Sequence, residues 1–346
     1  MLKRSALFLL LGTLALVGCS AEKQPESTTG TSASAGAGEA LKKDKLKVAM
    51  IAKSNGNPVF QSARVGAEAA AKDLSAKTGA QITIDWRTPD QEDGQVQAQR
   101  IAQAVNEGAD VVLISCSDAA KVTSAINDAV DKGVPVMTFD SDAPDSKRFA
   151  FYGADDMECG QRTMEELAKQ LGEKGSVAIL AGNQNAPNLQ KRVQGAKDEA
   201  KKYPGIKIVD TFYHPETPQD ATSAVMNAMN ANPQINGWAM IGGWPLFAPS
   251  LLKDLDPAKV KIVAVDALPA ELPYVDRGLA PVLLAQPTYN WGYKSIEIIV
   301  DKLVLGKEVQ AVNKMELTRV SKDNLKEWAR QLKEWGFTDV DPKFLE

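Results

Sequence analysis

Short apolar segments rich in β-branched residues alternate along the chain with longer segments whose apolar residues recur three and four positions apart. The first pattern predicts buried strands, and the second predicts amphipathic helices. Residues 60–77 and 96–106 are two of the helical segments. The predicted strands are residues 47–52, 82–85, 110–114, 134–139, 149–152, 176–181, 206–212, 237–241, 261–265 and 281–285.

The regular alternation of strands and helices indicates an α/β protein with parallel sheets, because parallel neighbours are joined by a crossover helix. The number of strands suits two doubly wound sheets better than one very large sheet. The chain has 346 residues, and a length of this order corresponds to about two domains. We therefore predict two similar α/β lobes, each built on a doubly wound parallel sheet.

The residues before the first strand have the pattern of an export signal. Lys3 and Arg4 precede an apolar run over residues 6–17, which is short for a membrane span but suits a signal-peptide core. The run ends at Leu16-Val17-Gly18-Cys19, which resembles a bacterial lipobox. We predict a lipoprotein signal peptide at residues 1–18 and membrane attachment through lipid on Cys19. An uncleaved anchor helix and a plain secretory signal are the alternatives.

Residues 19–45 are rich in Ser, Thr, Ala, Gly and Glu and show no apolar period. Such a segment buries too little apolar surface to repay the entropy of ordering, so we predict a flexible tether behind the lipidated cysteine. The protein is then exported and lipid-anchored, on the periplasmic or extracellular face of the membrane. The remaining thiols, Cys116 and Cys159, fit either a disulfide or two buried free cysteines.

Composition excludes several functional classes. The chain carries 40 Lys and Arg against 44 Asp and Glu, so it offers no basic surplus for nucleic acid. His214 is the only histidine, which excludes a metal site with several histidines and weakens any triad. Glycine-rich phosphate loops, a nucleophile elbow and a helix-turn-helix before the first lobe are all absent from the sequence. We expect no cofactor, no catalytic residues and no metal.

Ligands of open parallel sheets bind beyond the carboxyl ends of the strands, so the residues that follow each strand are candidates for a site. Carboxylates, amides, arginine and aromatic rings recur there, which suits a polyhydroxylated ligand whose hydroxyls donate and accept while its ring faces stack. These strand-end residues are Lys53, Asn55, Asn57–Phe60, Trp86, Arg87, Asp90, Asp140–Asp142, Asn183, Asn185, Tyr213, His214, Gly242–Trp244, Asp266 and Gln286.

Five short motifs, in this order and spacing, resemble the type I periplasmic sugar-binding proteins related to ribose-binding protein and to the effector domain of the lactose repressor. The resemblance covers residues 47–318 and implies a clamshell of two lobes joined by a three-strand hinge. It also implies that a monosaccharide is captured between the lobes and delivered to the membrane subunits of an ABC permease. The motifs are Asn57-Pro58-Val59-Phe60 with Gly66, Gly133-Val-Pro135-Val to Asp140, Arg192-Val-Gln-Gly195, Val263-Ala-Val-Asp266 and Ala285-Gln286.

The resemblance also implies lobe boundaries and roles. The N-terminal lobe would comprise residues 46–154 and 287–313, and the C-terminal lobe residues 155–286 and 314–346, including a helical extension after residue 318. Asn57 would hydrogen-bond the ligand, Phe60 would stack on it, Asp140 and Asp266 would accept from its hydroxyls, Arg192 would donate to it, and Gln286 would act near the hinge.

The sequence departs from the ribose binder at several site positions. Val59 replaces one of two adjacent aromatic residues, Ser141 replaces an arginine, and Gly243-Trp244 replaces an Asn-Asp pair. Trp244 or Trp86 is therefore a candidate for the second stacking platform. The Asp140-Ser141-Asp142 sequence is also similar to that of relatives that bind autoinducer-2 or larger sugars, so the identity of the ligand stays open.

Structural roles compete with each of these assignments. Asp140 and Asp266 suit helix N-caps, Arg192 suits a solvated helix face, and large aromatic residues such as Phe60 and Trp244 suit the core.

Two functions of other classes also stay open. One is a lipoprotein that senses a sugar or an autoinducer-2-like signal and reports to a chemoreceptor or sensor kinase. The other is a sugar hydrolase that uses paired carboxylates. A positive charge at Arg192 argues against the hydrolase because it would keep both carboxylates ionised.

Overall fold

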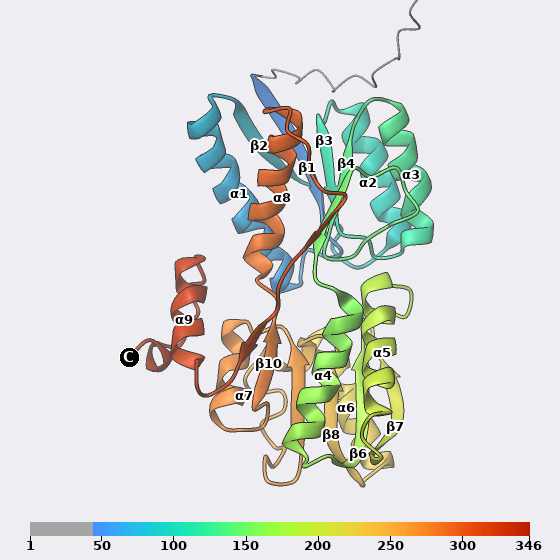
Figure 1. The fold of residues 1–346 in the computed structure, drawn as a ribbon, viewed down its shortest axis with the longest axis vertical. Helices are drawn as coiled ribbons and strands as arrows, with labels where there is room; N and C mark the ends of the chain where they lie inside the picture. The colour runs from blue at the N-terminus through green and yellow to red at the C-terminus, as the bar shows by residue number, and fades with distance from the viewer. Residues whose placement is uncertain (1–43) are drawn as a thin grey trace, which may run out of the picture. The chain divides into compact units, whose positions relative to one another are not determined.

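The computed structural model describes residues 44–346, whose strands form two six-stranded sheets. The first sheet has the order β11-β5-β4-β3-β1-β2, and its neighbouring strands pair in parallel. We call this sheet and its helices the first lobe (Figure 1). Its strands are β1 (Lys45–Ile51), β2 (Gln81–Trp86), β3 (Val111–Ile114), β4 (Val136–Phe139), β5 (Ala150–Gly153) and β11 (Val312–Lys314).

The second sheet has the order β12-β10-β9-β8-β6-β7 and forms the second lobe. Each predicted strand is present, so the α/β class with two doubly wound sheets is confirmed, with one correction at the edge. There β12 runs antiparallel to β10, because β10 leads out of the second lobe toward α8 of the first, whereas β12 leads back into the second lobe from β11. The strands are β6 (Lys174–Ala181), β7 (Gly205–Tyr213), β8 (Ile235–Met240), β9 (Lys261–Val265), β10 (Val282–Ala285) and β12 (Thr318–Val320).

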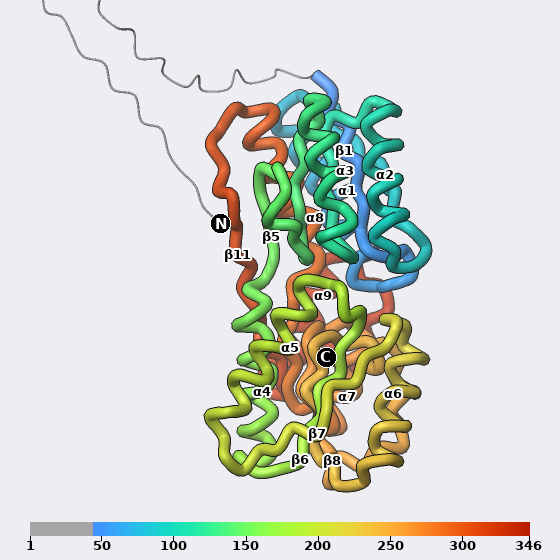
Figure 2. Tube along the Cα trace, turned by 90° about the vertical axis from the view of Figure 1, so that its right-hand side faces the viewer, coloured from blue at the N-terminus to red at the C-terminus, as the bar shows by residue number. Residues whose placement is uncertain are grey.

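Helices cover both faces of the first sheet, as Figures 1 and 2 show. Residues of β1 alternate between these faces: Val48 and Met50 pack beneath α1 and α8, whereas Ala49 and Ile51 pack beneath α2 and α3. This alternation is the two-residue period of a strand that is buried on both sides. The helices of this lobe are α1 (Pro58–Thr78), α2 (Gly94–Asn106), α3 (Ala119–Asp131) and α8 (Thr288–Leu303).

Helix α1 packs closely against α8, although they are far apart in the sequence (Figure 1). A Cβ atom on Gly66 would lie 2.0 Å from the backbone oxygen of Tyr289, and one on Gly292 would lie 1.8 Å from that of Ala63. Both distances are far below van der Waals contact, so only glycine allows the two backbones to approach in this way. This packing explains why Gly66 belongs to the motif that follows Asn57.

The second lobe has one large apolar core, which also includes part of the C-terminal extension. The predicted extension is helical: Trp328 of α9 is buried, and its Nε1 donates a hydrogen bond to the Ala267 carbonyl at 2.8 Å. Trp335 stacks on Tyr289 of the first lobe with ring centroids 5.8 Å apart. The helical segments are α4 (Asp156–Gln170), α5 (Pro187–Ala200), α6 (Pro218–Ala231), α7 (Leu272–Asp276), α9 (Leu325–Glu334), η1 (Trp244–Leu246), η2 (Pro269–Glu271) and η3 (Pro342–Phe344).

The chain passes between the two sheets three times, from β5 to α4, from β10 to α8 and from β11 to β12. The three-strand hinge of the predicted fold is therefore present. Figure 2 shows β11 beside β5 on the way to the third crossing. Sequence patterns missed β11 and β12 because three residues are too few to display a strand period.

Candidate ligand-binding cleft

Side chains from both lobes enclose a small cavity at the carboxyl ends of the two sheets, which we call the inner site. Its volume is about 30 Å³, which is roughly the share of one water molecule. All the predicted ligand-binding residues except Trp86 line it. The lining residues are Lys53, Asn57, Val59, Phe60, Asp140, Asn188, Leu189, Arg192, Glu216, Gly242, Trp244, Asp266, Gln286 and Trp291.

The amide of Asn188 joins the two lobes across the inner site. It lies at the start of α5, donates to Asp140 Oδ1 at 3.2 Å and accepts from Lys53 Nζ at 3.1 Å. Ser115 Oγ also donates to Asp140, at 2.7 Å. Burial would lower the pKa of Lys53, but nearby negative charges, first of all that of Glu92, outweigh it and raise the pKa. Lys53 is therefore a buried ammonium group at the centre of the cleft.

The close packing of α4 against α5 places Arg192 in the second lobe. A Cβ atom on Gly195 would lie 2.2 Å from the backbone oxygen of Met157, so glycine is required at this contact. Because the helices approach so closely, Arg192 Nε donates to Asp156 Oδ1 at 2.8 Å. Arg192 is 3% exposed, which contradicts the alternative of a solvated helix face.

A chain of hydrogen bonds links Arg192 to the ends of β10 and β9. Arg192 Nη2 donates to Gln286 Oε1 at 2.8 Å, and Gln286 Nε2 donates to Asp266 Oδ1 at 2.9 Å. The backbone N–H of Gly243 approaches Asp266 Oδ2 at 3.4 Å. Burial raises the pKa of Asp266, and the charge of Arg192 offsets part of this effect. The side chains of this network are thus held in fixed orientations before any ligand arrives.

Asp140 and Asp266 do not cap helices in the described part of the chain. Both have left-handed backbone conformations, with φ of 56° and 80°. The short helix after Asp266 has Leu268 at its N-cap position, and α4 begins only at Asp156. Non-glycine residues adopt this conformation at a cost of about 1–3 kcal/mol, a strain that is typical of functional sites.

The aromatic side chains of the inner site come from both lobes. Phe60 is 2% exposed and stacks on Trp291 of α8, with ring centroids 6.0 Å apart. Trp244 is also buried, and its ring lies nearly perpendicular to that of His214, with an interplanar angle of 78° and centroids 4.8 Å apart. Phe60 and Trp291 therefore form one continuous apolar wall, part of which borders the cavity.

Two predicted site residues have contacts that the sequence did not indicate. Asn57 caps α1, because its Oδ1 accepts from the backbone N–H of Val59 at 3.2 Å, and it also lines the cleft. Trp86 lines neither cavity of the cleft. Its Nε1 donates to Asn55 Oδ1 at 3.1 Å, and the guanidinium of Arg64 lies 5.5 Å from its ring.

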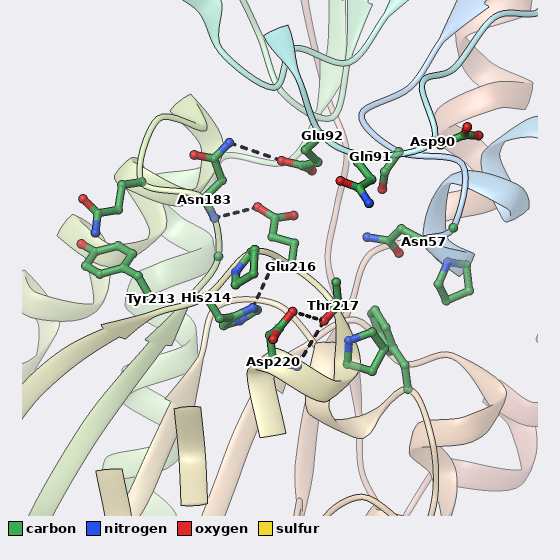
Figure 3. Close-up of a pocket in the computed structure, with 18 of the residues that line it drawn as sticks. Asn57, Asp90, Gln91, Glu92, Asn183, Tyr213, His214, Glu216, Thr217 and Asp220 are labelled. Atoms are coloured by element: carbon green, nitrogen blue, oxygen red, sulfur yellow. Dashed lines mark hydrogen bonds between the residues drawn. The ribbon is translucent and has the colours of Figure 1, made fainter. Parts of the chain in front are cut away.

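A larger cavity opens outward from the inner site, and we call it the outer chamber (Figure 3). Its volume is about 920 Å³, within the range of about 300–1,000 Å³ that is usual for small-molecule sites. Loops after β1, β2, β6 and β7 contribute most of its walls. The lining residues are Ser54, Gly56, Asn57, Pro58, Asp90, Gln91, Glu92, Gly182, Asn183, Gln184, Asn185, Tyr213, His214, Pro215, Glu216, Thr217, Pro218, Asp220 and Phe247.

Glu92 of the first lobe and Glu216 of the second point toward one another in this chamber (Figure 3). Asn183 contacts both: its Nδ2 donates to Glu92 Oε2 at 3.4 Å, and its backbone N–H donates to Glu216 Oε1 at 2.9 Å. Enclosure of the carboxyl group, and then the charge of Glu216, raises the pKa of Glu92 well above its usual range. Two carboxyl groups therefore face one another where the lobes meet.

The sequence did not single out Asn188, Asp156, Trp291, Glu92 or Glu216. Asn188 and Asp156 lie in the first turns of helices, where polar residues are most often caps. Trp291 has the helical spacing of a core residue. The sequence could have indicated Glu216, because it lies two residues after His214 at the end of a predicted strand. The position of Glu92 depends instead on the path of a longer loop.

Two doubly wound lobes that meet over a polar cleft at the carboxyl ends of both sheets define a clamshell binding protein. Comparison with known proteins agrees with this class. Residues 48–308 match the family model described as periplasmic binding protein domain, and the chain belongs to that family. The resemblance to type I periplasmic sugar-binding proteins of ABC transporters is thereby confirmed.

Three relatives illustrate the similarity. A xylitol-binding protein of Mycolicibacterium smegmatis is 24% identical over 70% of this chain and 70% of its own length. A D-ribose/D-allose-binding protein of Pseudomonas aeruginosa is 27% identical over 68% of this chain and 75% of its own. The crystal structure of a solute-binding protein of an ABC transporter from Burkholderia graminis C4D1M, in complex with D-arabinose, has a TM-score of 0.75 and 27% identity over 82% of this chain and 97% of its own.

Several expectations concern other parts of the molecule. The signal peptide, Cys19 and almost all of the tether lie outside the described residues, and β1 begins at Lys45, the last residue of the predicted tether. No helix among residues 44–346 has the length and apolar character of a membrane span. Cys116 and Cys159 are both free and buried, so they form no disulfide with one another.

Proposed function

We propose that this chain is an extracytoplasmic solute-binding lipoprotein that captures a monosaccharide or related polyol between its lobes and delivers it to an ABC permease. Asp140 and Asn57 of the first lobe lie across the inner site from Arg192, Asp266 and Gln286 of the second. This convergence of hydrogen-bonding groups from two lobes on one cavity is the observation that carries the proposal.

Binding couples to closure in this proposal. A ligand obtains its full set of hydrogen bonds only when both lobes surround it, so it shifts the population toward the closed form. Because Arg192, Gln286 and Asp266 already bond to one another, the second lobe presents a fixed set of partners, and closure brings Asp140 and Asn57 to the same ligand. The closed surface then docks on the membrane subunits, while lipid on Cys19 keeps the protein at the membrane.

The relatives support the choice of a sugar and of binding rather than catalysis, since their names describe binding of xylitol, of ribose or allose, and of arabinose. The role proposed for each cleft residue rests on its position in the inner site and on its chemistry. Carboxylates and amides accept and donate at hydroxyls, and the apolar wall of Phe60 and Trp291 suits a sugar ring face.

A thermal-shift titration of the full-length protein tests this function. Pentoses, hexoses, polyols and autoinducer-2 form the panel, and a ligand at about one hundred times its Kd should stabilise the native state by about 2.7 kcal/mol. We expect one sugar class to raise the melting temperature in a saturable way. Asp266→Asn should abolish that rise, whereas Asp254→Asn, the same change at an exposed position outside the cleft, should preserve it. A panel without any shift would contradict the proposal.

A further inference from the structure

The two cavities of the cleft differ greatly in size. The inner site holds about 30 Å³, whereas the outer chamber holds about 920 Å³. Lys53, which is 2% exposed, occupies the centre of the inner site, where its ammonium group donates to Asn188. With the lobes in this arrangement, a ligand much larger than a water molecule must therefore place most of its atoms in the outer chamber.

The outer chamber is strongly acidic. Four carboxylates line it, and none of its lining residues among residues 44–346 is a lysine or an arginine. Lys53 of the inner site supplies one positive charge that acts on both Glu92 and Glu216. Two of the four face solvent or stabilise a helix end. Asp90 is exposed to solvent, and Asp220 belongs to the N-terminal cap of α6, where Thr217 Oγ1 donates to it at 2.6 Å. Glu92 and Glu216 remain, and they are the pair that faces across the cleft (Figure 3).

The structure holds Glu216 in this position at some cost. Its backbone has a φ of 53°, a left-handed conformation that costs a non-glycine residue energy. Its backbone N–H donates to His214 Nδ1 at 3.0 Å. Its carboxyl group lies against Gly182, where a Cβ atom would come within 2.5 Å of Glu216 Oε1. Several local features thus direct a carboxylate at Glu92 of the other lobe.

Two polar atoms in the chamber lack partners. Within the described residues, Glu92 Oε1 is buried and accepts no hydrogen bond. His214 is 6% exposed, and its Nε2 is likewise buried without a partner. Because Nδ1 of this ring accepts from Glu216, and burial lowers the pKa of His214 to about 4, the neutral ring carries its proton on Nε2. Glu92 Oε1 and His214 Nε2 are therefore an acceptor and a donor without partners, both buried in the wall of the chamber.

We infer that the outer chamber is a subsite for a cationic group, and that Glu92 and Glu216 bind the ammonium group of an amine-bearing sugar or glycoside while His214 Nε2 donates to a neighbouring hydroxyl. This inference rests on the proposed function and specifies its ligand class. An ammonium group supplies three donors to two carboxylates from opposite lobes, so it links the lobes directly. Burial and the charge of Glu216 raise the pKa of Glu92, so an ammonium group between the two carboxyl groups favours the ionised form of Glu92, and any proton that this carboxyl group carries leaves to solvent.

Matched sets of sugars test the inference by titration calorimetry on the full-length protein. Each set contains an amine, its neutral parent and its N-acetyl form: glucosamine, glucose and N-acetylglucosamine; galactosamine, galactose and N-acetylgalactosamine; and the glucosamine disaccharide, cellobiose and diacetylchitobiose. In at least one set the amine should bind about tenfold or more tightly than both partners, as a close charge pair predicts. Titrations in buffers of different ionisation enthalpy should show proton release with the amine and none with the neutral sugar.

Variants locate the effect. Glu216→Gln keeps an oxygen that accepts from the Asn183 N–H but removes the negative charge. The Kd of the amine should then lie within about twofold of the Kd of the neutral sugar. Glu308→Gln, an exposed position that lines neither cavity, should preserve the preference for the amine. Melting temperatures close to that of the parent protein would verify that both variants fold.

The possible failures can be distinguished. Neutral sugars that bind as tightly as their amines, or a preference for the amine that survives in Glu216→Gln, would overturn the inference and leave the proposed function intact. If no sugar of any set binds, and the wider panel of pentoses, hexoses and polyols also fails, the inference and the proposed function fall together.

Discussion

The inner site provides each of its charged side chains with a hydrogen-bond partner, whereas the outer chamber leaves two carboxyl groups facing one another. Arg192 pairs with Asp156 and Gln286, and Asp266 accepts from Gln286. In the outer chamber, Glu92 Oε1 has no partner within the described residues. The hydrogen-bonding groups of the inner site are thus held in place by one another, whereas the outer chamber has two carboxyl groups for the single positive charge of Lys53 that acts on both. In our proposal, the inner site therefore offers a ligand hydrogen-bonding groups that are already held in place, and the outer chamber selects the charge of that ligand.

The largest effect is expected from removing the arginine of the inner site. Arg192→Ala would leave Asp156 as a buried carboxylate without its charge partner, which typically costs about 3–5 kcal/mol of unfolding free energy. Chemical denaturation measures this loss. Arg162→Ala is the matched control, since Arg162 approaches Glu158 only at 3.9 Å on the surface of α4, and such pairs contribute about 0–1 kcal/mol.

A double-mutant cycle separates the pair from its surroundings. If Arg192 and Asp156 act as one unit, the double alanine variant should lose clearly less stability than the two single variants lose in total. Additive losses would contradict the view that the inner site is a coupled network. Additive losses would also mean that the inner site is no more strongly coupled than the outer chamber.

The second effect concerns His214, at the border between the two regions. Burial lowers its pKa from 6.5 to about 4. A base whose pKa is lowered by folding contributes stability that is present above pH 6.5 and is lost as the pH falls toward 4, by up to about 3 kcal/mol. His214 is the only histidine in the sequence, so its ring signals in an NMR titration report this pKa directly. A titration near 6.5 would contradict the enclosed environment.

Strand-end positions explain how much of the cleft could be predicted. Asp140, Asp266 and Gln286 follow strands directly. The strand direction of a parallel sheet therefore places each of them at the carboxyl edge of its own sheet, independently of loop conformation. The structure brings all three to the inner site. Arg192 lies on a helix, and its position depends on the close contact at Gly195, which only the family resemblance suggested.

The outer chamber could not be predicted in the same way. Glu92 lies six residues beyond the end of β2, and the orientation of Glu216 depends on a left-handed backbone that its own side chain does not favour. Both depend on loop conformation, which hydrophobic periodicity does not encode. Trp86 illustrates the opposite error, because it ends β2 and yet contacts Asn55 and Arg64 instead of the cleft.

A third effect has the opposite pH dependence. Folding raises the pKa of Glu92, chiefly by enclosure and then by the charge of Glu216. An acid whose pKa is raised contributes stability that is complete below its usual value of 4.5 and is lost as the pH rises through the raised pKa. One such group gives a slope of at most about 1.4 kcal/mol per pH unit.

Glu92→Gln should reduce that slope and make the protein more stable than the parent at neutral pH. Glu271 will leave a residual slope, since burial raises its pKa as well. Thermal unfolding from pH 5 upward, with Glu308→Gln as the control, measures the difference. An unchanged slope in Glu92→Gln would contradict the raised pKa of Glu92.

The smallest effect separates the two kinds of carboxylate within the outer chamber. Thr217 Oγ1 accepts from the backbone N–H of Asp220 at 3.1 Å and donates to its side chain at 2.6 Å. Thr217 and Asp220 thus form the N-terminal cap of α6, and we expect neither to bind the ligand. Thr217→Ala should cost about 1 kcal/mol of unfolding free energy, as for other N-caps, and should leave the preference for an amine over its neutral parent unchanged. If Thr217→Ala also loses the preference for the amine, Asp220 belongs to the subsite for the cationic group. The assignment of Asp220 to a purely structural role would then be wrong. If only stability falls, Asp220 does not contribute to the preference for the amine, and Glu92 and Glu216 account for it. These two residues come from different lobes, so a ligand that binds both favours the closed form.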